Sequence, residues 1–130
     1  MNILITGGAG FIGYFLAHYH AQLKDKVFIL DNFFKSQGDG KEDLRSSFHG
    51  RDVHIYPVDL TKSIPPLDTP FQWDIVYHLA AINGTQLFYE IPYQVAYTNV
   101  KSTLNLLDWL ESKSVGRLIY TSSSEVYSGA

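Results

Sequence analysis

The sequence predicts an α/β fold with a doubly wound parallel sheet, and three observations support this prediction. Short apolar, β-branched segments recur along the 130-residue chain, each about as long as a buried strand. Longer segments whose apolar residues repeat with helical period lie between most of them. A glycine-rich turn directly follows the first apolar segment. Because strands that alternate with helices form parallel sheets with right-handed crossovers, we expect helices on both faces of the sheet.

The expected strands and helices follow from these patterns in chain order. The strands are predicted at residues 3–6, 27–30, 53–58, 74–80 and 118–121. The helices are predicted at residues 11–23, 42–48 and 92–111, the last beginning at a proline. One apolar face of the first helix is predicted from Phe11, Ile12, Phe15, Leu16, Tyr19 and Leu23. The corresponding face of the long helix is predicted from Val95, Val100, Leu104, Leu107 and Leu110.

Composition suits one globular domain and excludes several classes of partner. Hydrophobic residues make up 45% of the sequence, and 130 residues suffice for a single core. The net charge is −3 and the basic residues are scattered, so we expect no nucleic-acid partner. The chain has no cysteine, no metal-ligand spacing of histidines and no apolar run of about 20 residues. We therefore expect no metal and no membrane binding and, with no signal-like start, a cytoplasmic location.

The glycine-rich turn has the spacing G-x-x-G-x-x-G, formed by Gly7, Gly10 and Gly13. The first glycine lets the chain turn off the strand, the second leaves room for a pyrophosphate, and the third lets helix and strand pack closely. N–H groups and the positive end of the helix dipole then bind the phosphates. The pattern predicts a Rossmann-type fold, for which 3-2-1-4-5 is the simplest strand order. A P-loop is excluded, because Tyr14-Phe15 occupies the positions of its Lys-Ser/Thr pair.

An acidic residue, Asp31, ends the second predicted strand 18 positions after Gly13. A carboxylate there accepts hydrogen bonds from an adenosine ribose and repels a 2′-phosphate, which favours NAD over NADP. Asn32 is grouped with it as a cofactor-binding residue. Lys35 lies close enough in sequence to keep NADP open, and an ordinary strand-end Asp that starts a turn is the alternative for Asp31.

Four more stretches follow the glycine loop, at residues 59–60, 78–81, 99–103 and 121–127. Together with residues 7–13 they resemble the extended short-chain dehydrogenase/reductase family, which includes the NAD-dependent nucleotide-sugar epimerases and dehydratases. The resemblance covers the whole chain. It implies that the first of the four lies at the adenine and the second beside the pyrophosphate and nicotinamide ribose. The third then carries an Asn that supports the active-site strands, and the fourth carries the catalytic Ser or Thr.

NAD is therefore the expected cofactor, and the glycine pattern and the resemblance together give its expected contacts. The expected cofactor-binding residues are Gly7, Gly10, Phe11, Ile12, Gly13, Asp31, Asn32, Asp59, Leu60, Leu79, Ala80, Ala81, Asn99 and Thr121. Plain alternatives exist, because Asp59-Leu60 also suits a strand terminus and Asn99 a local hydrogen bond within a helix. We assign His78 no chemistry, since such a histidine is more often packed or capped than a ligand.

The last stretch contains the residues expected to act in catalysis, Ser123 and Glu125. In the family, the tyrosine of a Tyr-x-x-x-Lys motif takes a proton from a sugar hydroxyl while hydride passes to NAD. The Ser or Thr after strand five hydrogen-bonds the reacting oxygen, which by position is Ser123. Glu125 corresponds to a glutamate that removes a proton beside the transient 4-ketone in dehydratases, although Ser124 replaces their usual Asp. Epimerisation, dehydration and decarboxylation stay open, as does a solvent-facing Glu125.

The chain departs from the family in one respect, because no Tyr-x-x-x-Lys motif follows the fifth predicted strand. Tyr97 and Lys101 have this spacing but belong to the helix before that strand. We therefore expect residues 1–130 to form an NAD-binding Rossmann domain without the family's C-terminal substrate part, and with the edge of the fifth strand uncovered. Such a chain is expected to bind NAD weakly and to turn over no nucleotide sugar.

Two other hypotheses stay open beside that of an N-terminal part of a nucleotide-sugar enzyme. The chain could be a stand-alone NAD-binding module without catalysis, or a partner chain could complete its sheet through the open edge. In a complete enzyme the expected partner is a nucleotide-sugar substrate, and a homodimer stays open as well.

Overall fold

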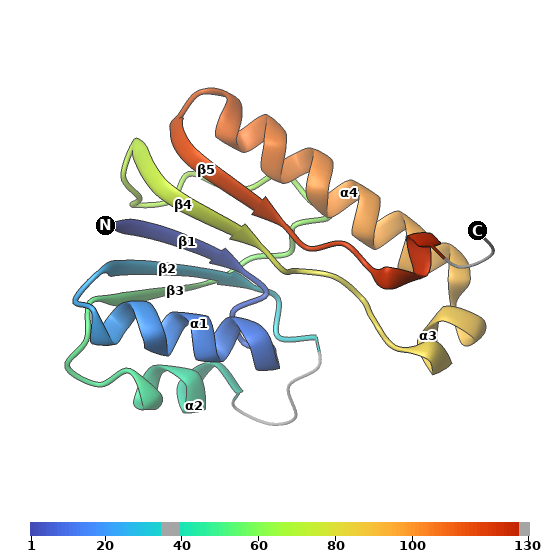
Figure 1. Ribbon diagram of the computed structural model, residues 1–130, viewed down its shortest axis with the longest axis horizontal. Helices are drawn as coiled ribbons and strands as arrows, with labels where there is room; N and C mark the ends of the chain where they lie inside the picture. The colour runs from blue at the N-terminus through green and yellow to red at the C-terminus, as the bar shows by residue number, and fades with distance from the viewer. Residues whose placement is uncertain (35–39, 128–130) are drawn as a thin grey trace.

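The computed structural model describes residues 1–34 and 40–127, in which five strands form one sheet (Figure 1). The strands are β1 (Asn2–Thr6), β2 (Lys26–Asp31), β3 (Val53–Pro57), β4 (Gln72–His78) and β5 (Ser114–Tyr120). Their order is β3-β2-β1-β4-β5 and every neighbouring pair is parallel, which confirms the predicted order. Because the order reverses between β1 and β4, the carboxyl ends of these two strands flank a topological switch point.

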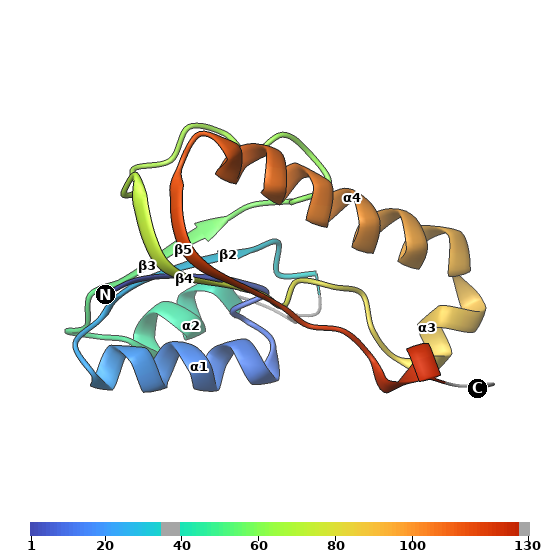
Figure 2. The same ribbon diagram turned by 45° about the horizontal axis from the view of Figure 1, so that its top comes forward.

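Helices cover both faces of the sheet, as predicted, and each face has its own core (Figure 2). The helices α1 (Phe11–Gln22) and α2 (Gly40–Ser47) lie against one face, and α4 (Pro92–Glu111) lies against the other. The short α3 (Thr85–Glu90) and the 3-10 turn η1 (Ser124–Tyr127) lie beyond the carboxyl ends of the strands. None of the helices in the described ranges is long and apolar enough to cross a membrane.

The face of α1 that meets the sheet is not the predicted one. Its buried residues include the small Gly13, Ala17 and Ala21. The larger side chains on the opposite face are exposed, namely Phe11, Ile12, Phe15, Tyr19 and Leu23. A Cβ on Gly13 would lie 2.4 Å from the carbonyl oxygen of Gly7, so the helix approaches the sheet too closely for large side chains at its start. Apolar periodicity thus predicted the helix correctly but assigned most of its large residues to the wrong face.

α4 has the predicted bounds, with its proline in the first turn. Its buried residues are Val95, Ser102, Asn105, Leu106 and Leu110. Three members of the predicted face, Val100, Leu104 and Leu107, are exposed instead. The polar Asn105 is buried because its amide donates hydrogen bonds of 2.8 and 3.1 Å to two carbonyls of the connection between β3 and β4.

Most element boundaries differ from the prediction by one or two residues, and the start of β5 differs by four. β4 begins and ends two residues before the predicted strand, and β5 begins at Ser114 rather than at residue 118. α3 was not predicted, since it has six residues, none of them buried, and therefore no apolar period that a sequence could show.

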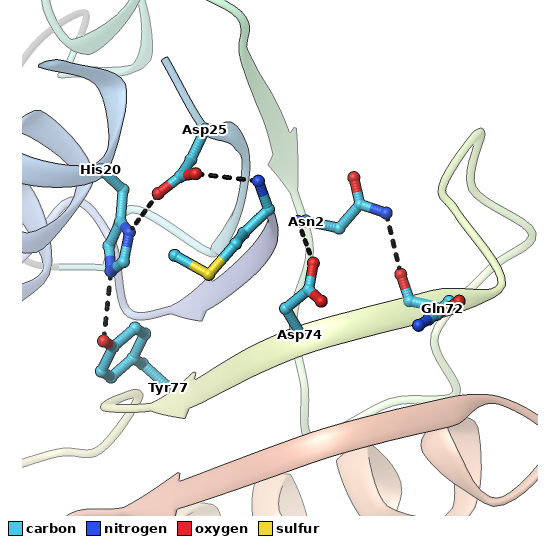
Figure 3. A network of polar contacts seen from close by, with 7 residues as sticks. Asn2, His20, Asp25, Gln72, Asp74 and Tyr77 are labelled. Atoms are coloured by element: carbon cyan, nitrogen blue, oxygen red, sulfur yellow. Dashed lines mark hydrogen bonds and ion pairs between the residues drawn. The ribbon is translucent and has the colours of Figure 1, made fainter. Parts of the chain in front are cut away.

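A network of polar contacts joins α1, β1 and β4 at the start of the chain (Figure 3). The buried Asp25 carboxylate accepts hydrogen bonds from the N-terminal ammonium and from Nδ1 of His20, each at 2.8 Å. Because the carboxylate only accepts, Nδ1 carries a hydrogen, and Nε2 lies 3.1 Å from the Tyr77 hydroxyl. Burial raises the pKa of Asp25, but the hydrogen bonds from the N-terminus and His20 outweigh it, and the pKa lies below 3.8.

Replacement of Asp25 by asparagine is expected to lower the free energy of unfolding by about 2 kcal/mol, because a buried charge-assisted pair is lost. The carboxylate's contribution is present above its unfolded pKa and is lost as the pH falls through the lower folded value. The hydrogen bond to Asp25 raises the pKa of the ammonium, whose contribution is lost as the pH rises through that value. Urea titrations should therefore show the largest deficit between about pH 4 and about pH 8. The exposed Asp108→Asn variant serves as control, and equal acid sensitivity of all three proteins would contradict this account.

Candidate functional site

The glycine loop lies at the switch point, where the ends of β1 and β4 come together. Gly7 has a φ of +72°, and a Cβ at this residue would lie 2.8 Å from the backbone nitrogen of Ala80. Its N–H donates a 2.9 Å hydrogen bond to the carbonyl of Leu30 in β2. Any residue larger than glycine would be strained by its own backbone and would collide with the loop after β4.

The N-terminus of α1 opens onto this loop without obstruction. Gly10 is the N-cap, is exposed, and offers no side chain that could cap the helix. The first turn contains no acidic residue, and its Phe11 and Ile12 side chains are exposed. The first N–H groups of a helix lack partners within the helix, and the dipole makes this end attractive to anions.

Asp31 fixes the glycine loop to the end of β2. One carboxylate oxygen accepts from the N–H of Ala9 in the loop at 3.0 Å, and the other accepts from the N–H of Phe33 at 2.7 Å. Asn32 is exposed and its side-chain oxygen accepts from the N–H of Phe34 at 3.0 Å. Asp31 is only half-buried, so it retains acceptor capacity beyond these two bonds. Lys35 lies outside the described residues.

The pair after β3 makes local contacts. Oδ1 of Asp59 accepts from the N–H and the hydroxyl of Thr61, at 3.0 and 2.7 Å, and Oδ2 lies 3.7 Å from Nζ of Lys62. Burial raises the pKa of Asp59, but the bonds from Thr61 and the charge of Lys62 bring it below its ordinary value. The side chain of Leu60 is buried in the core under α4, so only the backbone of this residue is left to face away from the core. This is the arrangement of a strand terminus that starts a turn.

The loop that follows β4 is held from two sides. The hydroxyl oxygen of Thr6, the last residue of β1, accepts from the N–H groups of Leu79 and Ala80, both at 3.2 Å. The side chain of Asn99 in α4 accepts from the N–H of Ile82 at 2.8 Å and donates to its carbonyl at 3.0 Å. Ala81, between these points, is exposed. Asn99 thus supports the loop, in line with the supporting role that the resemblance implies.

The residues after β5 lie at the same edge of the sheet. The N–H and hydroxyl of Thr121 lie 3.4 and 3.1 Å from the carbonyl of His78, to which both donate, and so continue the pairing of β4 with β5. Ser123 is exposed between β5 and η1. Glu125 belongs to η1, but its side chain lies outside what the structure describes.

Sequence reasoning missed three polar side chains that meet beneath the loop after β4. Nδ1 of the buried His78 lies 2.7 Å from the hydroxyl of Thr6, and Nε2 lies 2.9 Å from the hydroxyl of Thr103. Burial lowers the pKa of His78, which keeps the imidazole neutral. The signal in the sequence was a histidine at a strand end, which by itself does not reveal its partners.

The arrangement fits the phosphates and ribose of a dinucleotide. An uncapped helix N-terminus faces outward, the glycines occupy positions where a Cβ would collide or obstruct, and a carboxylate lies at the end of the adjacent strand. A parallel sheet with such a loop at its switch point defines a Rossmann-type fold of the class that binds dinucleotides. The chain belongs to the NAD dependent epimerase/dehydratase family, which residues 3–130 match.

Curated relatives and solved structures agree with this family. The chain is 36% identical over 124 residues to UDP-N-acetyl-alpha-D-glucosaminuronate decarboxylase of Bacillus cytotoxicus, covering 95% of this chain and 37% of that protein. It is 38% identical over 130 residues to UDP-glucuronic acid decarboxylase 6 of Arabidopsis thaliana, covering 98% and 35%. The structure of UDP-glucose-4-epimerase from Stenotrophomonas maltophila, with bound NAD and formylated UDP-arabinopyranose, superposes with a TM-score of 0.78 at 26% identity, covering 98% of this chain and 38% of that one.

The chain therefore spans little more than a third of the length of these proteins. By their names, the first two decarboxylate and the third epimerises nucleotide sugars.

Proposed function

We propose that this chain is the NAD-binding part of an epimerase/dehydratase that acts on a nucleotide sugar through a transient 4-keto intermediate. The observation that carries the proposal is the glycine loop at the switch point, tied by Ala9 to the carboxylate of Asp31. The family match over residues 3–130 and the NAD-bound structural relative support it.

Within this proposal the chain's own residues bind and orient the cofactor. The first turn of α1 donates N–H groups to the pyrophosphate, with Gly10 leaving the approach open. Asp31 accepts from the ribose hydroxyls with the lone pairs that Ala9 and Phe33 leave unused, and its charge disfavours the 2′-phosphate of NADP. Residues 79–81 would lie against the nicotinamide half, because they line the other side of the switch point.

The reacting end of the site would lie where β4 and β5 end. When bound, NAD supplies the hydride chemistry. Ser123 would hydrogen-bond the reacting sugar oxygen, and Glu125 would take the proton beside the 4-ketone, roles that the family resemblance implies. Because the relatives include decarboxylases and an epimerase, both decarboxylation and epimerisation stay within the proposal.

A stand-alone module that binds NAD without catalysis is the second candidate. Tyr97 and Lys101 lie in α4, before β5, so residues 1–130 do not themselves form the family's proton-transfer motif under either candidate. Both candidates require NAD binding, and they differ in whether a substrate part follows in the natural protein.

Calorimetric titration of the 130-residue chain with NAD and NADP tests the binding step. We expect weak binding with a preference for NAD. Asp31→Ala should reduce NAD affinity roughly 10- to 100-fold, because charge-assisted hydrogen bonds to the ribose are lost. The ratio of the two affinities is the decisive readout, since any loosening of the glycine loop affects both cofactors while only NADP gains from removal of the charge. The exposed Asp108→Ala variant is the control, and an unchanged ratio in Asp31→Ala would remove Asp31 from the site.

The same NAD complex, mixed with UDP-glucuronic acid or UDP-glucose, tests the catalytic step. We expect neither release of carbon dioxide nor a new sugar nucleotide by chromatography. Turnover by residues 1–130 would contradict the proposal that this chain is only the cofactor-binding part, and intact mass measurement of the natural protein would separate the two candidates.

A further inference from the structure

Each hydrogen around the buried ring of His78 has an assignable position, beginning at Thr6. The hydroxyl oxygen of Thr6 accepts from the N–H of Ala80 at 3.2 Å and shares the N–H of Leu79 with the backbone carbonyl of Thr6, each at 3.2 Å. Because the oxygen faces these two donors, the single hydrogen of the hydroxyl is left to donate elsewhere. Its nearest acceptor is Nδ1 of His78 at 2.7 Å, and this nitrogen therefore carries no hydrogen.

The other side of the ring leads to the same conclusion independently. The hydroxyl of Thr103 donates to the carbonyl of Asn99, one turn earlier in α4, at 2.9 Å. With its hydrogen used there, Thr103 accepts from Nε2 of His78 at 2.9 Å. The ring is thus neutral, with its hydrogen on Nε2. The burial of the ring also favours the neutral form, because a charged imidazole would lose its hydration.

The residues at the two ends of this series of hydrogen bonds hold the two ends of the loop formed by residues 79–82. Thr6 holds the start of residues 79–82 through two N–H groups, and Asn99 holds the end through both backbone groups of Ile82. The bonds form a directed series from the loop N–H groups through Thr6, His78 and Thr103 to the backbone of Asn99. Reversing any member would place two donors against each other, so the series fixes the loop in one arrangement.

We propose that His78, as its neutral Nε2–H tautomer, is a positioning residue that sets the conformation of residues 79–82 through Thr6 and Thr103, and thereby the affinity for the cofactor. The part of this inference that concerns affinity rests on the proposed function, whereas the tautomer and the loop conformation do not. The ring of His78 is buried and makes its hydrogen bonds to Thr6 and Thr103, so it acts on the loop through these two residues. Its effect is transmitted by hydroxyl groups from β1 and α4.

Imidazole ¹⁵N chemical shifts of the 130-residue chain test the tautomer directly. We expect Nε2 of His78 to be protonated and Nδ1 to be an unprotonated acceptor. A protonated Nδ1, or exchange averaging between the two nitrogens, would overturn the proposal. This measurement needs no ligand and no variant, so it determines the tautomer of His78 even if a substituted chain fails to fold.

Thr103→Val and Thr103→Ser form a matched pair for the positioning role. Valine keeps the shape but removes the acceptor for Nε2, whereas serine keeps the hydroxyl. In Thr103→Val we expect faster amide hydrogen exchange at Leu79, Ala80 and Ile82 and roughly tenfold weaker NAD binding, both restored in Thr103→Ser. If the wild type does not bind NAD, the proposed function fails while the exchange rates still test the series. If NAD binds and both variants match the wild type in exchange and affinity, the positioning role is wrong.

Discussion

Replacing Gly13 by alanine is expected to abolish NAD binding and to lower the free energy of unfolding by about 3 kcal/mol. The added Cβ would lie 2.4 Å from the carbonyl oxygen of Gly7 and 2.7 Å from Cα of Gly8. Both neighbours are backbone atoms, so no side chain can turn away, and α1 must move off the sheet. The higher helix propensity of alanine offsets only about 1 kcal/mol of this cost. Because the helix N-terminus and the loop move apart, the phosphate site is lost together with the stability.

Gly10→Ala is the matched control in the same loop. Gly10 has an ordinary φ of −76° and is exposed, and the nearest atom to an added Cβ is the carbonyl oxygen of Gly7 at 3.2 Å. We expect the fold to persist at a cost below about 1 kcal/mol, while NAD binding weakens because the methyl group obstructs the helix N-terminus. Urea unfolding and NAD calorimetry on both variants check the pair. A stable Gly13→Ala chain that still binds NAD would contradict the close packing of helix and strand.

The glycine loop and Asp31 could be predicted because the physics that places them is local. Seven residues fix the turn from β1 into α1, and Asp31 follows from the end of the next strand, which pairs in parallel with β1. The alternation of strands and helices predicted a parallel sheet, and the Rossmann-type fold indicated by the glycine loop predicted its strand order. The buried face of α1 could not be predicted in the same way, because large apolar residues dominate its period while the approach of Gly13 to the sheet admits only small ones.

The hydrogen-bond series around His78 could not be predicted because its members, unlike those of the glycine loop, are distant in sequence. His78 is 72 residues from Thr6 and 25 residues from Thr103, and only the sheet register and the crossover through α4 bring them together. Asn99 differs, because the family resemblance implied a supporting role for it although its amide reaches Ile82 across 17 residues. A threonine at a strand end and a threonine in a helix have no distinctive pattern, so the loop after β4 was predicted as a site without the contacts of Thr6 and Thr103 to His78.

Trp73→Ala is expected to have the largest effect of any single substitution in the core, lowering the free energy of unfolding by about 3 to 5 kcal/mol. Trp73 is fully buried in β4. Its ring packs edge-on against Phe28 of β2 at 5.1 Å and lies 6.2 Å from the ring of Trp109 in α4, so it joins the sheet to the helix that covers it. Alanine would leave a cavity between rigid elements that cannot collapse to fill it.

Trp73→Phe should lower the free energy of unfolding far less than Trp73→Ala, because the indole has an N–H that is unpaired within the described ranges. Nε1 of Trp73 is buried and has no hydrogen-bond partner among the described residues, a deficit that offsets part of the ring's contribution by about 1 to 3 kcal/mol. Phenylalanine keeps an aromatic contact with Phe28 and removes the unpaired donor, so the expected net loss is about 1 kcal/mol. Circular dichroism in urea is the suitable measurement, because both substitutions change the tryptophan fluorescence. If Trp73→Phe proves as destabilising as Trp73→Ala, the volume of the indole rather than its unpaired N–H governs this site, and the core between β4 and α4 tolerates a buried donor at little cost.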